Sequence, residues 1–171
     1  MERITIGLAE KLTSPCPFAL LTVRTPSGET NVMAVSWWTY TSSNPPMVAV
    51  SLSNKGFSGK CIDNSGAFGL NFVGESLRTE AFLAGTCSGQ FGGKAMKLNI
   101  PLITIEQAHQ EMIPGSRLWL CCSLKNQINA GDHTLFLGEV ESAWGDSYVD
   151  ALFAFEGYKR LDLVETRSNK E

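Results

Sequence analysis

Short runs of apolar and β-branched residues recur along this chain, and polar turn residues separate them. Such runs, bounded by Gly, Pro, Asn and Ser clusters, are typical of β-strands. The clusters TPSGET, TSSNPP and NAGD indicate hairpin turns between neighbouring strands. The strands predicted in this way cover residues 18–24, 31–40, 47–53, 67–73, 100–107, 117–128 and 133–144.

Two short helices are predicted between the strands. Ser58 is the expected N-cap of the first, which runs through Asp63 and stops at the sequence Asn-Ser-Gly. The second covers 76–84, with Glu80 completing a capping pattern. Four glycines in GTCSGQFGG, residues 85–93, predict a flexible or ligand-shaped loop.

Strands dominate this pattern, and hairpins link most of them. The predicted fold is therefore mainly β: one antiparallel, Greek-key-like β-barrel over residues 1–171, decorated with short helices. A parallel dinucleotide-binding fold is excluded because no G-x-G-x-x-G opens a helix after a strand.

Composition narrows the classes of function. The hydrophobic share of 43% predicts a folded core, and the net charge of −3 argues against a broad nucleic-acid surface. The five cysteines form no C-x-x-C pair and only two histidines accompany them, so no metal site is predicted. The N-terminus lacks the pattern of a signal peptide and no run reaches transmembrane length, which predicts a cytoplasmic protein without membrane contact.

The segment SLSNKGFSGK, residues 51–60, leads from a strand into a helix N-terminus. Free backbone N–H groups, hydroxyls and Lys55 or Lys60 at such a junction favour a small anion. The same pattern also fits an ordinary capped helix with solvated lysines.

Trp37 and Trp38 are adjacent on a predicted strand and should point to opposite faces. One then packs in the core while the other faces a cleft or a partner, or is simply half exposed. His133 follows a tight turn at the predicted barrel rim. There it can bond a cofactor or substrate, bridge a subunit interface, or serve the fold alone.

Hydrolytic machinery is not recognisable in this sequence. No G-x-S-x-G occurs, and the carboxylates are scattered. If the protein is an enzyme, a cofactor is expected to carry the chemistry, so no catalytic residue is assigned and His133 stays a candidate.

Four motifs in order resemble the flavin reductase-like family, which includes the flavoredoxins. They are the strand pair NVMAVSWWTYTSSNPPMVAVSL, the segment SNKGFSGKCIDNSGAFGLNFV, the loop GTCSGQFGGKA and the hairpin AGDHTLFLGEVESA. The resemblance spans residues 18–144. Gln90 and Gly93 depart from the Arg and Asp that the family often carries in its loop, while Lys94 keeps the positive charge.

This resemblance implies an FMN-binding split β-barrel that forms a homodimer with flavin near the interface. It implies that Ser36, Trp37, Trp38 and Thr39 line the isoalloxazine ring, with Trp37 the favoured ring contact, and that Ser51, Leu52, Ser53, Asn54, Lys55 and Ser58 hold the ribityl chain and phosphate. Ser88, Gly89 and Lys94 would close over the cofactor, with His133 near its reactive edge.

The implied function is electron or hydride transfer through bound FMN. The donor is NADH, NADPH or a redox protein, so the chain is either a flavin reductase or an electron carrier. Two alternatives stay open: a non-redox FMN-binding or structural barrel, and a split barrel of the pyridoxamine-phosphate-oxidase kind.

Overall fold

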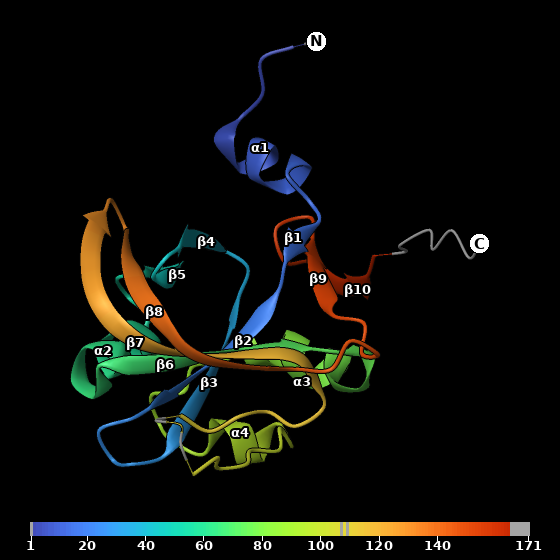
Figure 1. The fold of residues 1–171 in the computed structure, drawn as a ribbon. Helices are drawn as coiled ribbons and strands as arrows, with labels where there is room; N and C mark the ends of the chain where they lie inside the picture. The colour runs from blue at the N-terminus through green and yellow to red at the C-terminus, as the bar shows by residue number, and fades with distance from the viewer. Residues whose placement is uncertain (1, 107, 109, 165–171) are drawn as a thin grey trace.

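The computed structural model describes residues 2–106, 108 and 110–164, and these form two antiparallel sheets with short helices around them (Figure 1). The larger sheet contains, in spatial order, β3 (Thr30–Val35), β2 (Ala19–Arg24), β6 (Ala67–Val73), β7 (Ser116–Ala130), β8 (His133–Gly145), β5 (Pro46–Ser53) and β4 (Trp38–Ser43). The smaller sheet contains β1 (Cys16–Pro17), β9 (Leu152–Phe155) and β10 (Arg160–Leu163). The helices are α1 (Ile6–Leu12), α2 (Phe57–Ser65), the 3₁₀ helix η1 (Glu75–Leu77), α3 (Arg78–Ala84) and α4 (Lys94–Lys97).

The predicted strand 31–40 is wrong, because it is two strands at opposite edges of the larger sheet. β3 pairs with β2, opposing Val35 to Ala19, whereas β4 pairs with β5, opposing Trp38 to Val50. The chain crosses from one edge to the other at Ser36 and Trp37. The aromatic pair therefore marks a crossing point, and the alternation that a single strand would impose does not apply there.

Five of the other predicted strands are confirmed. The strands expected at 18–24, 47–53, 67–73, 117–128 and 133–144 match β2, β5, β6, β7 and β8 to within two residues at each end. β7 and β8 are the longest strands and bend along their length (Figure 1), with register shifts at Cys121/Cys122 and Leu124/Asn126. Such bulges bend a strand and increase its twist, so the sheet curls.

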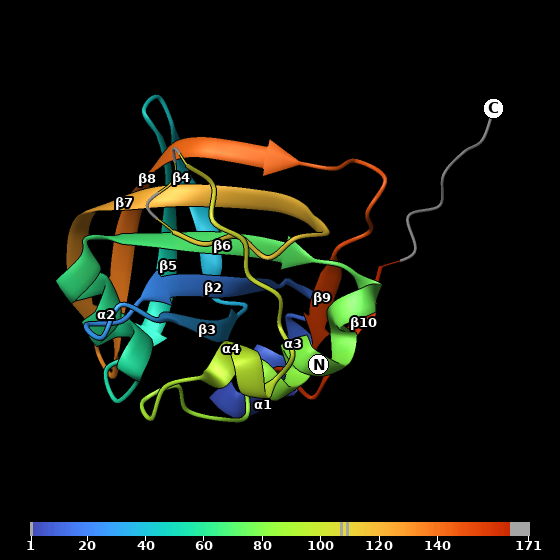
Figure 2. The same ribbon diagram turned by 90° about the horizontal axis from the view of Figure 1, so that it is seen from below.

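Two hydrophobic clusters account for the apolar runs. Leu21, Leu70 and Phe136 belong to the cluster on one face of the larger sheet. Leu20 and Ile113 belong to the other cluster, which also includes residues of α3, α4 and the smaller sheet. Figure 2 shows α3 and α4 beside β3. Because β2 and β6 are covered on both faces, nearly every residue in them is buried and the sequence shows runs rather than strict alternation.

The strand expected at 100–107 is wrong over its described residues. Ile103 makes an isolated bridge to Met112, Ile100 is buried in the second cluster, and position 107 lies outside the described residues. Ile100 and Leu102 pack in or against the second cluster, whereas Ile103 is exposed. Further along the chain, the Ile113 N–H donates to Asn71 Oδ1 at 2.8 Å, which attaches the chain before β7 to β6.

Both helix starts also differ from prediction. α2 begins at Phe57 after Gly56, so Ser58 lies inside the first turn. The helix continues past the expected last residue, Asp63, to Ser65, and it ends within the expected Asn-Ser-Gly stop, where Gly66 has a φ of 67°. The segment 76–84 divides into η1 and α3, and neither has a side-chain cap, so the capping pattern assigned to Glu80 is wrong. α1, α4 and the smaller sheet were not predicted. None of the described helices is long and apolar enough to cross a membrane.

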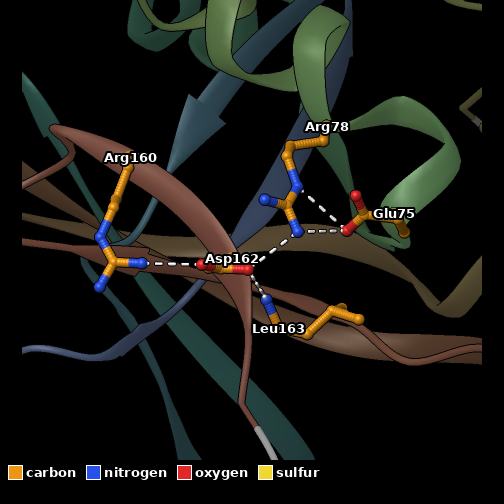
Figure 3. A network of polar contacts seen from close by, with 5 residues as sticks. All are labelled: Glu75, Arg78, Arg160, Asp162 and Leu163. Atoms are coloured by element: carbon orange, nitrogen blue, oxygen red, sulfur yellow. Dashed lines mark hydrogen bonds and ion pairs between the residues drawn. The ribbon is translucent and has the colours of Figure 1, made fainter.

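An ion-pair network attaches the start of α3 to β10 (Figure 3). Arg78 contacts Glu75 and also bonds Asp162 Oδ1 at 2.8 Å, while Arg160 bonds Asp162 Oδ2 at 2.7 Å. The Leu163 N–H, and then Arg78, lower the pKa of the Asp162 carboxyl. This network fixes the helix whose C-terminal end borders the candidate site.

Candidate functional site

Two adjoining hollows form one groove along β3. The first, the polar hollow, has a volume of about 330 Å³ and is lined by Asn31, Met33, Ala34, Lys55, Gly56, Phe57, Ser58, Lys60, Ala84, Gly85, Cys87, Ser88, Gly89, Gln90 and Lys94. The second, the aromatic hollow, measures about 240 Å³ and is lined by Met33, Ala34, Val35, Ser36, Trp37, Ser51, Ser53, Gly85, His133 and Tyr158. Met33, Ala34 and Gly85 are common to both, so the two hollows adjoin along these residues.

Three lysines give the polar hollow its charge. Lys55 precedes α2 and Lys60 lies in its first turn, and both are exposed, whereas Lys94 is only 5% exposed. Lys94 Nζ donates to the Ala84 carbonyl at 2.6 Å. Burial lowers the pKa of Lys94, and the neighbouring Cys87 thiol opposes part of that effect. Burial disfavours the charged form of Lys94, and an anion bound here would stabilise that form.

A buried polar pair forms the floor of the polar hollow. Asn31 Nδ2 donates to Ser58 Oγ at 2.9 Å, and both side chains are at least nine-tenths buried. Asn31 Oδ1 has no hydrogen-bond partner among the described residues. A Cβ added to Gly89 would lie 1.7 Å from that oxygen, so only glycine allows the loop to pass over Asn31. Sequence reasoning missed Asn31, although a polar residue within a buried strand was the available signal.

The aromatic hollow is built around Trp37 and His133. Their ring centroids are 4.9 Å apart, and the Trp37 side chain is 49% exposed. The Trp37 carbonyl accepts a 2.8 Å hydrogen bond from the Ser51 N–H, which anchors the crossing segment to β5. His133 Nδ1 lies 2.7 Å from Asp132 Oδ1, and this hydrogen bond lowers the pKa of the Asp132 carboxyl. Trp37 therefore packs against His133 and keeps about half of its surface exposed beside the groove.

Tyr158 forms another wall of the aromatic hollow. Its hydroxyl lies 2.7 Å from the Ala81 carbonyl and 2.9 Å from the Phe82 carbonyl, and it donates to this pair. Its ring stacks on Phe82 with centroids 5.5 Å apart, and burial raises the pKa of its hydroxyl. Gly85 is required beside it, since an added Cβ would lie 2.3 Å from a Tyr158 ring carbon. Sequence reasoning missed Tyr158 because it attached no chemistry to the C-terminal segment.

Most residues predicted for the site line this groove, and four do not. Those that line it are Ser36, Trp37, Ser51, Ser53, Lys55, Ser58, Ser88, Gly89, Lys94 and His133. Those that the structure places elsewhere are Trp38, Thr39, Leu52 and Asn54.

Each of the four has a structural environment of its own. Trp38 Nε1 donates to the Pro17 carbonyl at 3.2 Å, and its ring packs 4.8 Å from that of Phe72. Leu52 is in the core, and Thr39 is exposed on β4. The Asn54 amide accepts from Thr134 Oγ1 at 2.8 Å and donates to the Gly131 carbonyl at 3.2 Å, which fixes the strand end to the β7–β8 turn.

Known proteins share this fold and are similar to this chain in sequence. Residues 12–162 match the model of the flavin reductase like domain. An uncharacterized protein of Aeropyrum pernix is 25% identical over 163 residues, which cover 94% of this chain and 62% of that protein. The NADH-dependent flavin reductase StyB of Pseudomonas fluorescens is 29% identical over 125 residues, covering 72% of this chain and 68% of StyB. Among solved structures, the flavoredoxin of Desulfovibrio vulgaris (Miyazaki F) has a TM-score of 0.84 at 23% identity, with 96% of this chain and 94% of that one covered.

Proposed function

This chain belongs to the flavin reductase-like domain family, and from that membership we propose that it binds FMN in the groove and works as an oxidoreductase. The observation that carries the proposal is the polarity of the groove: a lysine-lined hollow adjoins a hollow walled by Trp37, His133 and Tyr158. A flavin mononucleotide has the same order of chemistry, with a phosphate at one end and a flat ring at the other.

The residues present fit each part of this cofactor. The lysines and the backbone N–H groups near the start of α2 suit a phosphate dianion. Ser58 keeps its own hydroxyl proton without an acceptor among the described residues, and Asn31 Oδ1 lacks a donor there. A ribityl hydroxyl of the cofactor can accept the Ser58 proton, and a buried polar pair is stabilised when its hydrogen bonds are completed.

Bound FMN supplies the redox chemistry by accepting and passing on a hydride or single electrons. The chain's own residues bind and orient it. Trp37 and Tyr158 restrict the ring to the aromatic hollow, Ser51 and Ser53 offer hydroxyls along its edge, and His133 adds a hydrogen-bonding ring nitrogen. No side-chain acid or base is required for hydride transfer, and none is assigned.

Within this function, we propose NADH or NADPH as the electron donor. StyB is named as an NADH-dependent flavin reductase, which favours this donor. The alternative is an electron carrier with tightly held FMN. We also propose a homodimer with the flavin near the interface, in which a second copy covers part of the exposed Trp37 ring. Light scattering on the purified protein measures this directly, and a monomer would contradict it.

The absorption spectrum of the purified protein tests the main proposal. A yellow protein, or a colourless one whose tryptophan fluorescence is quenched by added FMN, is expected. Anaerobic bleaching by NADH or NADPH alone supports the reductase, while bleaching only by dithionite or a redox protein supports the carrier. A colourless protein that ignores FMN would overturn the proposal and favour a non-redox barrel.

A further inference from the structure

A further hollow, here called the basic cleft, lies between α3 and β10, away from the candidate site. Its volume of about 380 Å³ exceeds that of the polar hollow. Six of its seven lining residues are apolar or basic, and the seventh is Thr79: the six are Phe82, Leu83, Leu161, Arg78, Lys159 and Arg160. None of the seven lines the polar or the aromatic hollow, so a molecule in the basic cleft leaves the proposed flavin site free.

The apolar part of the cleft follows one side of α3. Phe82 and Leu83 lie there next to Leu161 of β10, which is buried in the second cluster. The Phe82 ring is half-buried against Tyr158, whereas the Leu83 side chain is 42% exposed. Apolar side chains left accessible and bordered by charged ones are characteristic of protein–protein interaction sites.

Two of the basic side chains are held in position by Asp162. Arg78 and Arg160 lie on either side of this carboxylate, and each bonds one of its oxygens (Figure 3). Arg78 also contacts Glu75, and the Arg160 guanidinium lies 4.2 Å from the centroid of the Phe155 ring. Because these contacts already restrict the two side chains, less conformational freedom is lost when a further acceptor binds to them.

The cleft keeps donors that the described residues do not satisfy. Arg160 commits Nη1 to Asp162, and its other two guanidinium nitrogens have no hydrogen-bond partner among the described residues. Lys159 is exposed, and its ammonium has neither a hydrogen bond nor an ion pair within the described part of the chain. No acidic side chain is among the seven that line the cleft. Carboxylates complement this lining, because a guanidinium binds them through paired N–H groups and an ammonium adds a point charge.

The lining favours a segment of a protein over a small molecule. Small-ligand sites surround most of the ligand with apolar side chains, whereas Thr79, Lys159 and Arg160 are exposed. An accessible apolar centre with arginine and aromatic side chains is instead the composition of a protein interface. The chain's own residues 165–171, which follow β10 in the sequence and lie outside the described residues, carry as many basic as acidic side chains. They therefore offer no acidic excess to the cleft.

We propose that the basic cleft docks an acidic segment of a partner protein. One apolar side chain of that segment packs against Phe82 and Leu83, and carboxylates on either side of it bind Lys159 and Arg160. The charges guide the segment to the cleft and set its position, while the apolar contact adds affinity. This docking does not depend on the proposed function, because it uses none of the residues assigned to the flavin.

Fluorescence anisotropy with labelled peptides measures the docking. The probe is a fluorescein-labelled peptide of sequence EEDFEDE, and EEDAEDE is its counterpart without the large apolar side chain. The Phe peptide should bind the parent protein more tightly than the Ala peptide, and both should bind more weakly as the salt concentration rises. Lys159→Glu should raise the Kd of the Phe peptide about tenfold or more, because attraction becomes repulsion. Arg3→Glu makes the same charge change at an exposed residue outside the cleft and should leave the Kd unchanged.

Leu83→Ser tests the apolar half of the cleft. Leu8→Ser on α1 is the matched control, because the exposed fraction of Leu8 is 43% against 42% for Leu83 and it lies outside the cleft. Leu83→Ser should raise the Kd of the Phe peptide about threefold or more, since apolar contact is lost, and leave that of the Ala peptide unchanged. Leu8→Ser should match the parent with both peptides. Thermal unfolding of each variant checks that the fold is retained.

Several results would overturn the proposal. The first is no binding of the Phe peptide up to millimolar protein, and the second is the same Kd in Lys159→Glu and Arg3→Glu. Binding that is lost in Lys55→Glu but kept in Lys159→Glu would place the peptide in the polar hollow instead. A short labelled oligothymidylate that binds as tightly as the peptide would assign the cleft to nucleic acid. A dimer that Lys159→Glu separates, measured by light scattering, would assign it to a second copy of this chain. None of these measurements requires bound FMN.

Discussion

The Lys94 ammonium donates a 2.6 Å hydrogen bond to the carbonyl oxygen of Ala84, and this bond joins the two ends of loop 85–93. Ala84 is the last residue of α3, and Lys94 is the first of α4. Between them the loop places Ser88, Gly89 and Gln90 over the polar hollow. The lysine therefore has two functions in the proposed site: it closes the loop and adds positive charge below it.

Replacing Lys94 should loosen this closure. Lys94→Met keeps the apolar stem but removes the donor, and we expect the free energy of unfolding at neutral pH to fall by about 1–3 kcal/mol as the Ala84 carbonyl loses its partner. FMN affinity should fall as well. Urea denaturation and fluorescence titration measure the two effects. Lys97→Met is the control, because Lys97 Nζ is exposed and its 3.2 Å bond to the Gly92 carbonyl is open to water.

The effect of Lys94→Met on stability should depend on pH. Burial lowers the pKa of Lys94 below its usual 10.5, so the unfolded chain holds this proton more firmly than the folded one. Wild-type stability should therefore rise relative to Lys94→Met as the pH rises through the folded pKa, and the difference should level off above about 10.5. Denaturation curves for both proteins at several alkaline pH values measure it. A difference that shrinks with pH would contradict the assignment.

Gly89→Ala should disturb the loop and the site together. The new methyl group would meet Asn31 Oδ1 at 1.7 Å, so the loop or the Asn31–Ser58 pair must move. We expect a loss of roughly 1–3 kcal/mol in stability and weaker FMN binding. Gly7→Ala is a suitable control, because nothing lies within 4 Å of its added Cβ and its φ is not positive. Equal FMN affinity in both variants would show that the loop does not contact the ligand.

The hairpins were predictable because their signals are local. The turn after Ala130 and the apolar runs around it specify β7 and β8 without reference to the rest of the chain. The break at Ser36 was not predictable, since it depends on β3 and β4 finding partners at opposite edges of the sheet. Distant pairing also explains the missed smaller sheet, in which β1 meets β9 more than a hundred residues later.

In the candidate site, too, residues with a local signal were predictable and residues whose role depends on distant partners were not. Lys55, Ser58 and Lys94 could be selected because hydroxyls and lysines beside a helix start or a glycine-rich loop are a local pattern. Asn31 and Tyr158 could not, because their roles arise from what lies across from them: Ser58 for Asn31, and the carbonyls of α3 for Tyr158.

The two neighbouring tryptophans should respond differently to mutation. Trp38→Ala removes a ring that packs on Phe72 and bonds the Pro17 carbonyl, and should cost roughly 3 kcal/mol of stability. Trp37→Ala removes a half-exposed ring and should cost under about 1 kcal/mol, yet weaken FMN binding and reduce the quenching of fluorescence. Thermal unfolding and FMN titration of both variants measure this. The reverse pattern would place Trp38, not Trp37, at the flavin.

Reversing the charge of Lys55 tests the phosphate end. Lys55 is exposed at the mouth of the polar hollow, so Lys55→Glu should leave the fold intact. We expect FMN binding to weaken by about 1.5–3 kcal/mol, roughly a ten- to hundredfold rise in Kd, because a charge-assisted contact is lost. Riboflavin, which has no phosphate, should lose far less affinity. Arg3→Glu makes the same change in net charge at an exposed residue outside the groove, and its FMN affinity should equal that of the parent. If Lys55→Glu and Arg3→Glu bind FMN alike, the phosphate does not lie beside Lys55.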